Sequence, residues 1–185
     1  MDFKAYLELF HQIVSSKQPL APYDQPMYMD YTKLNWSRMN RWLKRGVLTD
    51  DMITAVRQIG RAQQWIVITE PWCGDAAHIV PFLHLIAQEN PLIEVSYELR
   101  DSDPHRIHEY LTNGSKSIPK LIIRDENQVD IAVWGPRPED CHALYEALSE
   151  QGADFETVKT ALQNWYNQDK GQSLQEELAR LMGTW

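Results

Sequence analysis

The sequence has few cysteines: Cys73 and Cys141 are the two in 185 residues. Two are too few for the multi-bridge framework of small secreted proteins, so any cysteine chemistry should be redox or nucleophilic. The chain also lacks an early basic, apolar and small-residue leader pattern, and nowhere do about 18 apolar residues follow one another. We therefore expect a cytoplasmic protein, in a reducing compartment, that does not enter a membrane.

Positive charge is scarce as well. The chain has 18 lysines and arginines against 26 acidic residues, which gives a formal net charge of -8. This balance repels phosphate backbones, and the one dense basic stretch, residues 38–45, alternates with apolar residues at helical spacing. We therefore expect no nucleic-acid partner.

Motifs that bind cofactors are missing. The sequence contains no P-loop, no glycine-rich dinucleotide fingerprint and no nucleophilic-serine elbow. The pairs His105 with His108 and His78 with His84 have no second pair at zinc-site spacing, which favours surface histidines. We expect neither a cofactor nor a bound metal.

The chain divides into three segments. Residues 1–62 form an N-terminal helical extension, in which the proline-containing stretch 17–26 separates the first helix from the second. Residues 63–150 alternate strand and helix patterns, and residues 151–185 form two C-terminal helices that pack on the domain. A content of 43% hydrophobic residues suits one packed domain with appended helices.

Short β-branched runs predict the strands. Runs at 65–69 and 93–99 flank a helix-length segment, 74–89, and so indicate a βαβ unit. Runs at 120–124 and 129–134 flank a polar turn and predict an antiparallel hairpin. The predicted fold is α/β, with a central mixed sheet flanked by helices.

Helix-start signals complete the prediction. Asp103-Pro104 predicts a helix with Ile107 and Leu111 inward that ends at Asn113-Gly114. Another helix is expected over residues 138–148. Thr49 is expected to cap the third helix, and Ser173 with Glu176 to form a capping box for the last.

The segment Trp72-Cys73-Gly74-Asp75 lies where the first strand meets its helix. A proline, Pro81, follows Cys73 after eight residues, Ile118-Pro119 comes from a distant loop, and Gly135 follows sixteen residues after that proline. In these features the chain resembles the thioredoxin superfamily over about 85 residues. The resemblance implies that Pro119 is cis and faces the sulfur of Cys73.

The sequence departs from the thioredoxin pattern at two positions. Thioredoxins resolve a mixed disulfide with a second cysteine three residues after the first, and here that residue is Ala76. Val67 stands where the family commonly buries an acid as a proton acceptor. Cys141 is an alternative resolving cysteine, but its helical stripe with Leu144 and Leu148 favours a buried, small apolar role.

The ionisation of Cys73 depends on opposing effects. Unpaired N–H groups and the dipole of a helix start favour the thiolate, whereas the negative charge of Asp75 nearby disfavours it. The pattern therefore leaves two interpretations open: a reactive thiol, or a vestigial cysteine in a fold kept for another purpose.

Two functions follow. The first is monothiol exchange, in which Cys73 forms a mixed disulfide with a protein or low-molecular-weight thiol and an external thiol then resolves it. The residues expected to bind the substrate are Trp72, Gly74, Asp75, Ile118 and Pro119. Trp72 argues against the glutaredoxin variant of this chemistry. Glu70, where peroxiredoxins have threonine, argues against a peroxidase. The second function is a non-catalytic peptide-binding or protein-binding module in the same groove. The oligomeric state is not predicted.

Overall fold

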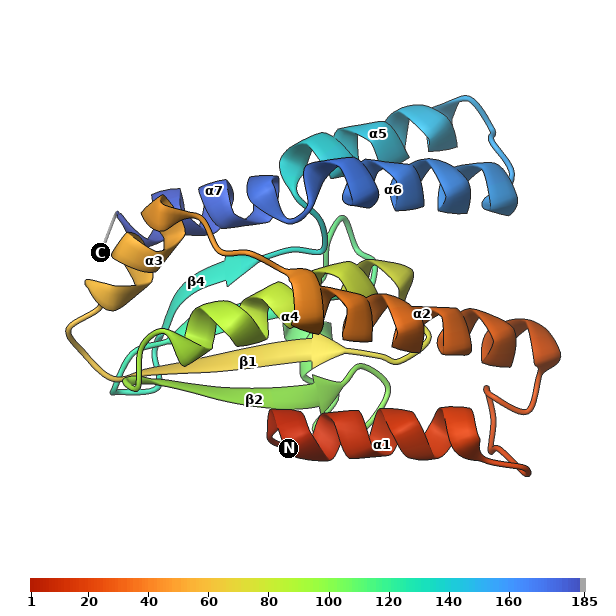
Figure 1. Ribbon diagram of the computed structural model, residues 1–185, viewed down its shortest axis with the longest axis horizontal. Coiled ribbons are helices and arrows are strands. Elements are labelled where there is room, and N and C mark those ends of the chain that lie inside the picture. The colour runs from red at the N-terminus through yellow and green to blue at the C-terminus, as the bar shows by residue number, and fades with distance from the viewer. Residues whose placement is uncertain (184–185) are drawn as a thin grey trace.

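A four-stranded mixed sheet lies at the centre of the computed structural model, which describes residues 1–183 (Figure 1). Helices flank it, as the predicted α/β fold requires. In chain order the elements are α1 (Phe3–Ser15), α2 (Pro26–Arg45), α3 (Asp50–Arg57), β1 (Gln63–Thr69), α4 (Gly74–Gln88), β2 (Ile93–Leu99), the short 3₁₀ helix η1 (Arg106–Glu109), β3 (Lys120–Arg124), β4 (Asp130–Trp134), α5 (Glu139–Glu150), α6 (Phe155–Asp169) and α7 (Gln172–Met182).

The strands lie in the order β2-β1-β3-β4. The β1 strand pairs in parallel with β2 and antiparallel with β3, and β3 pairs antiparallel with β4. At the middle of the sheet Trp65 lies between Val95 and Ile123. Because β1 and β3 have neighbours on both edges and are buried, they read as nearly continuous apolar runs. The predicted βαβ unit and hairpin are thus confirmed.

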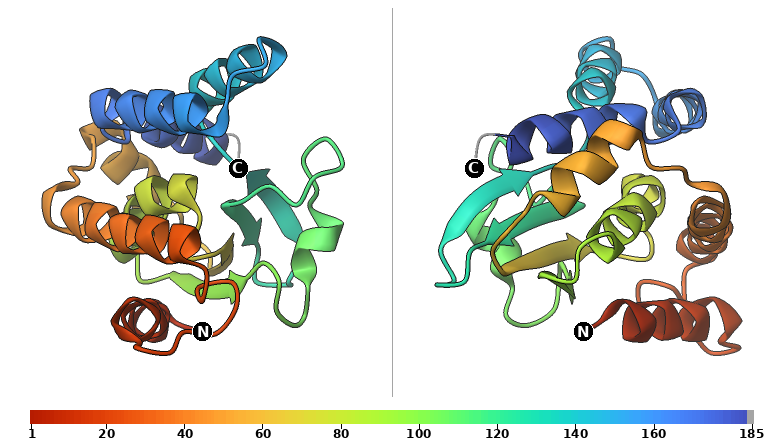
Figure 2. Two further views of the ribbon diagram at one scale, coloured as in Figure 1. Left: turned by 90° about the vertical axis from the view of Figure 1, so that its right-hand side faces the viewer. Right: turned by 60° about the vertical axis from the view of Figure 1, so that its left-hand side comes forward.

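Helices α4 and α2 form successive layers on one side of the sheet. In Figure 2 both lie on that side, whereas the η1 segment lies on the other. Almost all of α4 is buried, because it is covered by the sheet on one side and by α2 on the other. The α2 helix begins at Pro26, where proline is well suited to the first helical position. Helix α2 therefore begins at the last residue of the proline-containing stretch 17–26 that separates it from α1.

The C-terminal helices pack on the rest of the molecule. Helices α5 and α6 run side by side, and α7 lies along α3 (Figure 1). The Trp134 indole N–H donates to Glu177 at 2.7 Å, which fixes α7 against the end of β4. Thr49 caps α3 by accepting from the Met52 N–H, as predicted.

The helix predicted from Asp103-Pro104 is wrong. The segment contains only the one-turn η1, because His105 takes a left-handed backbone conformation (φ 55°) that a regular helix cannot continue through. Ile107 is buried as expected, but Leu111 is 43% exposed.

The capping box predicted for α7 is also wrong. The helix begins earlier, with Gly171 as its N-cap. The N–H and hydroxyl groups of Ser173 both donate to Asp169, the last residue of α6. The same carboxylate accepts from the Gly171 N–H, so Asp169 rather than Ser173 organises the junction between the two helices.

Gly135, directly after β4, lies close to the backbone of the loop before β3. Its φ is 107°, and an added Cβ would lie 2.4 Å from the Pro119 carbonyl oxygen. Gly114 also has a positive φ, but open space surrounds it. We predict that Gly135→Ala lowers the free energy of unfolding by about 2–4 kcal/mol, and Gly114→Ala by about 1 kcal/mol. Urea denaturation measures both, and equal losses would contradict the close approach.

Candidate functional site

Cys73 is the N-cap of α4. Its Sγ accepts from the Ala76 N–H at 3.4 Å, and its thiol donates to the Ile118 carbonyl at 3.4 Å. The Ile118–Pro119 peptide bond is cis. The structure therefore brings the sulfur and the loop before β3 together, although they are 45 residues apart in the chain. The Cys73 residue is 7% exposed.

The surroundings of Cys73 disfavour its thiolate. Burial raises the pKa of the Cys73 thiol to about 12, and the negative charge of Asp75 adds to this effect. The Ala76 N–H and the Arg137 guanidinium act in the opposite direction, with smaller effects. At neutral pH the Cys73 thiol is therefore protonated. The helix-start effect is therefore present, but burial outweighs it.

Asp75 is held by two partners from distant parts of the chain. Arg137, in the loop before α5, forms an ion pair with it at 2.7 Å, and the Tyr166 hydroxyl of α6 donates to it at 2.8 Å. Asp75 is 9% exposed, so its charge is compensated inside the protein. The hydrogen bond from Tyr166 to Asp75 also fixes α6 against the start of α4.

His78 lies one turn further along α4 and stacks on the Tyr166 ring at 4.4 Å. Its Nδ1 accepts from the Trp42 indole N–H at 2.8 Å, and its Nε2 faces the Gln163 side-chain oxygen at 3.3 Å. Burial lowers the pKa of His78 to about 3. The expectation of a surface histidine is wrong here, because α2 and α6 cover this face of α4.

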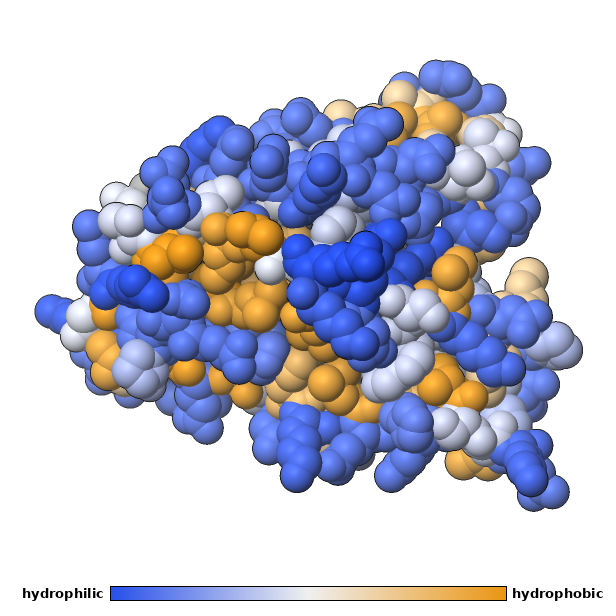
Figure 3. All heavy atoms as spheres, in the orientation of Figure 1, coloured by the Kyte–Doolittle hydropathy of each residue, from blue (hydrophilic) through white to orange (hydrophobic). Residues whose placement is uncertain are grey.

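A pocket of about 890 Å³ opens beside Cys73. In Figure 3 the surface is indented on the right-hand side, between the lobe of α5 and α6 and the end of α2. Of the predicted site residues, Pro119 is buried and does not line the pocket. The others do line it: Trp72, Cys73, Gly74, Asp75 and Ile118.

Helix α2 forms one wall of this pocket through Tyr31. An added Cβ on Gly74 would lie 2.1 Å from the Tyr31 hydroxyl oxygen, so the tyrosine packs directly against the glycine. On the other side, the Arg100 guanidinium lies over the Trp72 ring at 4.6 Å. Tyr31 thus covers Gly74, the first residue of α4, and Arg100 covers Trp72 just before that helix.

Cys141 is fully buried and free, as its helical stripe predicts. Burial raises the pKa of its thiol to about 12, with Asp75 as the second cause. Neither cysteine is in a disulfide. Cys141 therefore has the properties of a core residue.

Several residues of the site were not predicted from the sequence. All of them except His78, which lies on α4, come from a helix or loop outside the strand–turn–helix motif that contains Cys73. A buried Asp75 requires a cation, but the sequence does not say which of the chain's cations it is. The unpredicted residues are Tyr31, Arg38, His78, Arg137 and Tyr166.

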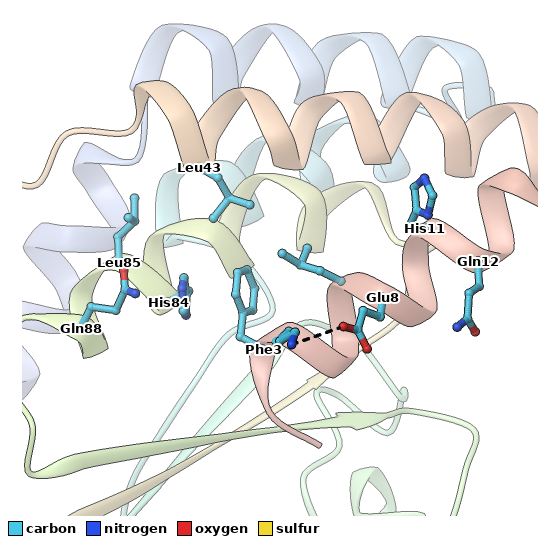
Figure 4. A pocket seen from close by; sticks show the side chains of 10 residues that line it. Phe3, Glu8, His11, Gln12, Leu43, His84, Leu85 and Gln88 are labelled. Carbon is cyan, nitrogen blue, oxygen red and sulfur yellow. Dashed lines mark ion pairs between the residues drawn. The ribbon is translucent and has the colours of Figure 1, made fainter.

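A second pocket, of about 690 Å³, lies between α1, α2 and α4 (Figure 4). Phe3 stacks on His84 there at 3.7 Å, and burial lowers the pKa of His84 to about 4. Lys4 and Glu8 form an ion pair at its edge. This pocket shares no lining residue with the pocket beside Cys73.

Within residues 1–183, no three His, Cys, Asp or Glu side chains are grouped so that they could hold a metal ion. None of the described helices combines the length and apolar character needed to cross a membrane.

Comparison with known proteins agrees with this geometry. The chain matches the family described as thioredoxin over residues 22–151, which include α2 and α3 as well as the sheet. Because the match spans more than half of the sequence, the chain belongs to the thioredoxin family. No curated protein matches it at the required significance.

Two solved structures are similar in fold. One is a protein of unknown function from Pseudomonas aeruginosa, which is 17% identical with a TM-score of 0.61, over 99% of this chain and 92% of that one. The other is an HIV epitope scaffold, which is 15% identical with a TM-score of 0.57, over 100% of this chain and 99% of that one. At these identities the likeness shows the fold alone.

The effect of Asp75 on the thiol is testable. We predict that Asp75→Asn lowers the pKa of Cys73, because it removes the neighbouring negative charge. At a fixed pH between 7 and 9, iodoacetamide should then alkylate Cys73 severalfold faster than in the unchanged protein. The measurement uses a Cys141→Ala background, so that Cys73 is the one thiol present. Asp30→Asn, in the same pocket but on the exposed side of α2, is the control and should not change the rate.

The assignment of a neutral His78 predicts a dependence of stability on pH. Between pH 6.5 and about 3 the unfolded chain binds a proton that the folded protein excludes, so the free energy of unfolding falls as the pH falls. The loss is at most about 1.4 kcal/mol per pH unit. Urea denaturation at several pH values should show a smaller loss in His78→Gln.

Glu70 contributes the opposite slope in both proteins, because burial raises its pKa to about 7 and favours its protonated form in the fold. The difference between wild type and His78→Gln therefore isolates the histidine. Identical pH slopes in the two proteins would contradict the assignment.

Proposed function

We propose that this protein is a binding module on a thioredoxin fold, which holds an extended peptide in the pocket between α2, α6 and the loop before β3. One observation carries the proposal: the Cys73 thiol is almost enclosed and donates a hydrogen bond to the Ile118 carbonyl, beside a pocket of about 890 Å³. Pockets of this size commonly bind ligands through an apolar wall with a few polar groups.

The pocket suits an extended chain. Lys116 and Ser117 line it and belong to none of the strands, so their backbone groups can pair with a bound segment as an additional strand does. On the opposite side α6 supplies apolar side chains, among them Val158 and Leu162. In this function Cys73 is a wall residue. The two free cysteines support a reducing compartment such as the cytoplasm.

Monothiol exchange is the second candidate, because the Sγ of Cys73 accepts the Ala76 N–H and lines the pocket. In this reaction the Cys73 thiolate attacks one sulfur of a substrate disulfide. A mixed disulfide forms and the other sulfur leaves as a thiolate. An external thiol, a protein thiol or a small one such as glutathione, then attacks as its thiolate and releases Cys73. The position of Ala76 supplies no sulfur for an internal second step.

An unfolded test protein, offered as a ligand in two forms, distinguishes these two functions. One form has scrambled disulfides, and the other is reduced and blocked with iodoacetamide. The binding function predicts equal affinity for both forms, before and after Cys73→Ser. The exchange function predicts a mixed disulfide with the scrambled form that accumulates in wild type and is cleared by excess glutathione. If the protein catalyses exchange, Ala76→Cys should release the substrate from the mixed disulfide without an external thiol, because the new sulfur lies one helical turn from Cys73.

The pocket itself is tested by filling it. Val158→Trp should weaken binding of the blocked unfolded protein about tenfold or more, because the indole occupies the space of the ligand. Thr160→Trp, exposed on the same helix and outside the pocket, is the matched control and should bind as wild type. If the blocked protein binds wild type and Val158→Trp equally, or binds neither, the proposed pocket is wrong.

A further inference from the structure

Arg38 is a buried cation that the protein itself does not neutralise. It is 7% exposed and lines the pocket beside Cys73. Within the described residues no Asp or Glu carboxylate pairs with it. Its Nη1 donates to the neutral side-chain oxygen of Asn35 at 2.8 Å, and its Nε is buried with no hydrogen-bond partner. A guanidinium stays charged in proteins, and burying an unpaired charge is costly.

The acidic residues of the pocket are engaged elsewhere or lie outside its interior. Asp75 is taken by Arg137 and Tyr166. Glu156 pairs with Lys159 at 2.5 Å, and Asp30 is exposed. An anion that pairs with Arg38 must therefore come from a group other than these three carboxylates.

The groups that surround Arg38 are neutral or positive. The guanidinium lies 5.2 Å from the centre of the Tyr31 ring. His78 is held neutral by burial, and Arg38 is one of the charges that lower its pKa. Burial lowers the pKa of Arg41, on the same helix, and the charge of Arg38 lowers it further. The local field therefore favours a negative ligand group.

The orientation of Arg38 is fixed before any ligand binds. Asn35 is fully buried, and its amide N–H donates to the Pro71 carbonyl at 3.2 Å. This bond directs the Asn35 oxygen towards the Arg38 guanidinium. A preset guanidinium loses less side-chain freedom on binding a carboxylate, which it can hold through two parallel hydrogen bonds.

Three exposed apolar side chains line the mouth of the pocket, beside polar ones such as Asp30 and Lys116. Met27 is 70% exposed, Leu34 is 45% exposed and Phe155 is 62% exposed. These three side chains offer an apolar surface to a ligand outside the charged interior. A complementary ligand has an apolar body and one negative end.

We propose that Arg38 binds the carboxylate of a ligand whose apolar chain lies along Met27, Leu34 and Phe155. This inference rests on the proposed binding function and names its ligand class. The carboxylate of an apolar peptide's C-terminus and that of a free fatty acid share this chemistry.

The test compares two matched pairs of probes on the full chain. The first pair is octanoate and octanamide, and the second is an N-acetylated apolar tetrapeptide with a free or an amidated C-terminus. Binding is followed by NMR at the Gly74 amide and at the Nε–H of Arg38. We expect the carboxylate of at least one pair to bind about tenfold or more tightly than its amide. The pair that shows the preference identifies the source of the carboxylate.

Two variants test whether Arg38 is the residue that causes the preference for a carboxylate over its amide. Arg38→Met keeps an unbranched, flexible apolar chain but removes the guanidinium, and it should reduce the preference to less than about threefold. Arg41→Met is the matched control, because Arg41 lies on the same helix, bonds to Asn167 and does not line the pocket. It should retain the full preference. The comparison of probes on wild type needs no variant, so it stands even if Arg38→Met fails to fold.

Equal binding of carboxylate and amide in both pairs would overturn the inference and leave the proposed pocket intact. A preference that survives in Arg38→Met would overturn it as well. If no probe binds, the inference is wrong, and the binding of the blocked unfolded protein decides separately on the proposed function.

Discussion

The buried carboxylate of Asp75 is the constraint on which the site depends. It joins the start of α4, the loop before α5 and the last turn of α6 through Arg137 and Tyr166. Removing one partner of such a pair leaves an uncompensated buried charge, at a cost of about 3–5 kcal/mol. A single side chain beside Cys73 thus fixes α6 and the loop before α5 against the start of α4. Because α6 forms one wall of the pocket, the same carboxylate also helps to set the shape of the pocket.

This arrangement has a chemical consequence for the neighbouring cysteine. The charge that assembles the site is negative and lies two residues from Cys73, so it opposes the thiolate that exchange chemistry needs. Burial by Tyr31 and the loop before β3 acts in the same direction. Both effects disfavour activation of the sulfur, and the missing resolving cysteine at Ala76 agrees with this balance.

Local patterns predicted much of the fold, whereas the site depends on contacts between distant residues. The β2 and β3 strands match their predicted runs, because alternation and β-branched content are local properties. The helix predicted at Asp103 failed, because the left-handed residue His105 interrupts it. The motif correctly placed Cys73 at the start of α4, next to the loop that contains Ile118 and Pro119. Tyr31, Arg38 and Arg137 could not be predicted, since nothing near them in the sequence indicates which buried groups they meet after folding.

The pocket is built from segments spread along most of the chain, from Met27 on α2 to Tyr166 on α6. No part of it survives if these helices separate, so a ligand that occupies it binds the native state and not the unfolded chain. Occupancy must therefore raise the melting temperature of the whole molecule, by an amount set by ligand concentration and affinity. A library of small acids and peptides can accordingly be ranked by heating alone, without any assay of activity.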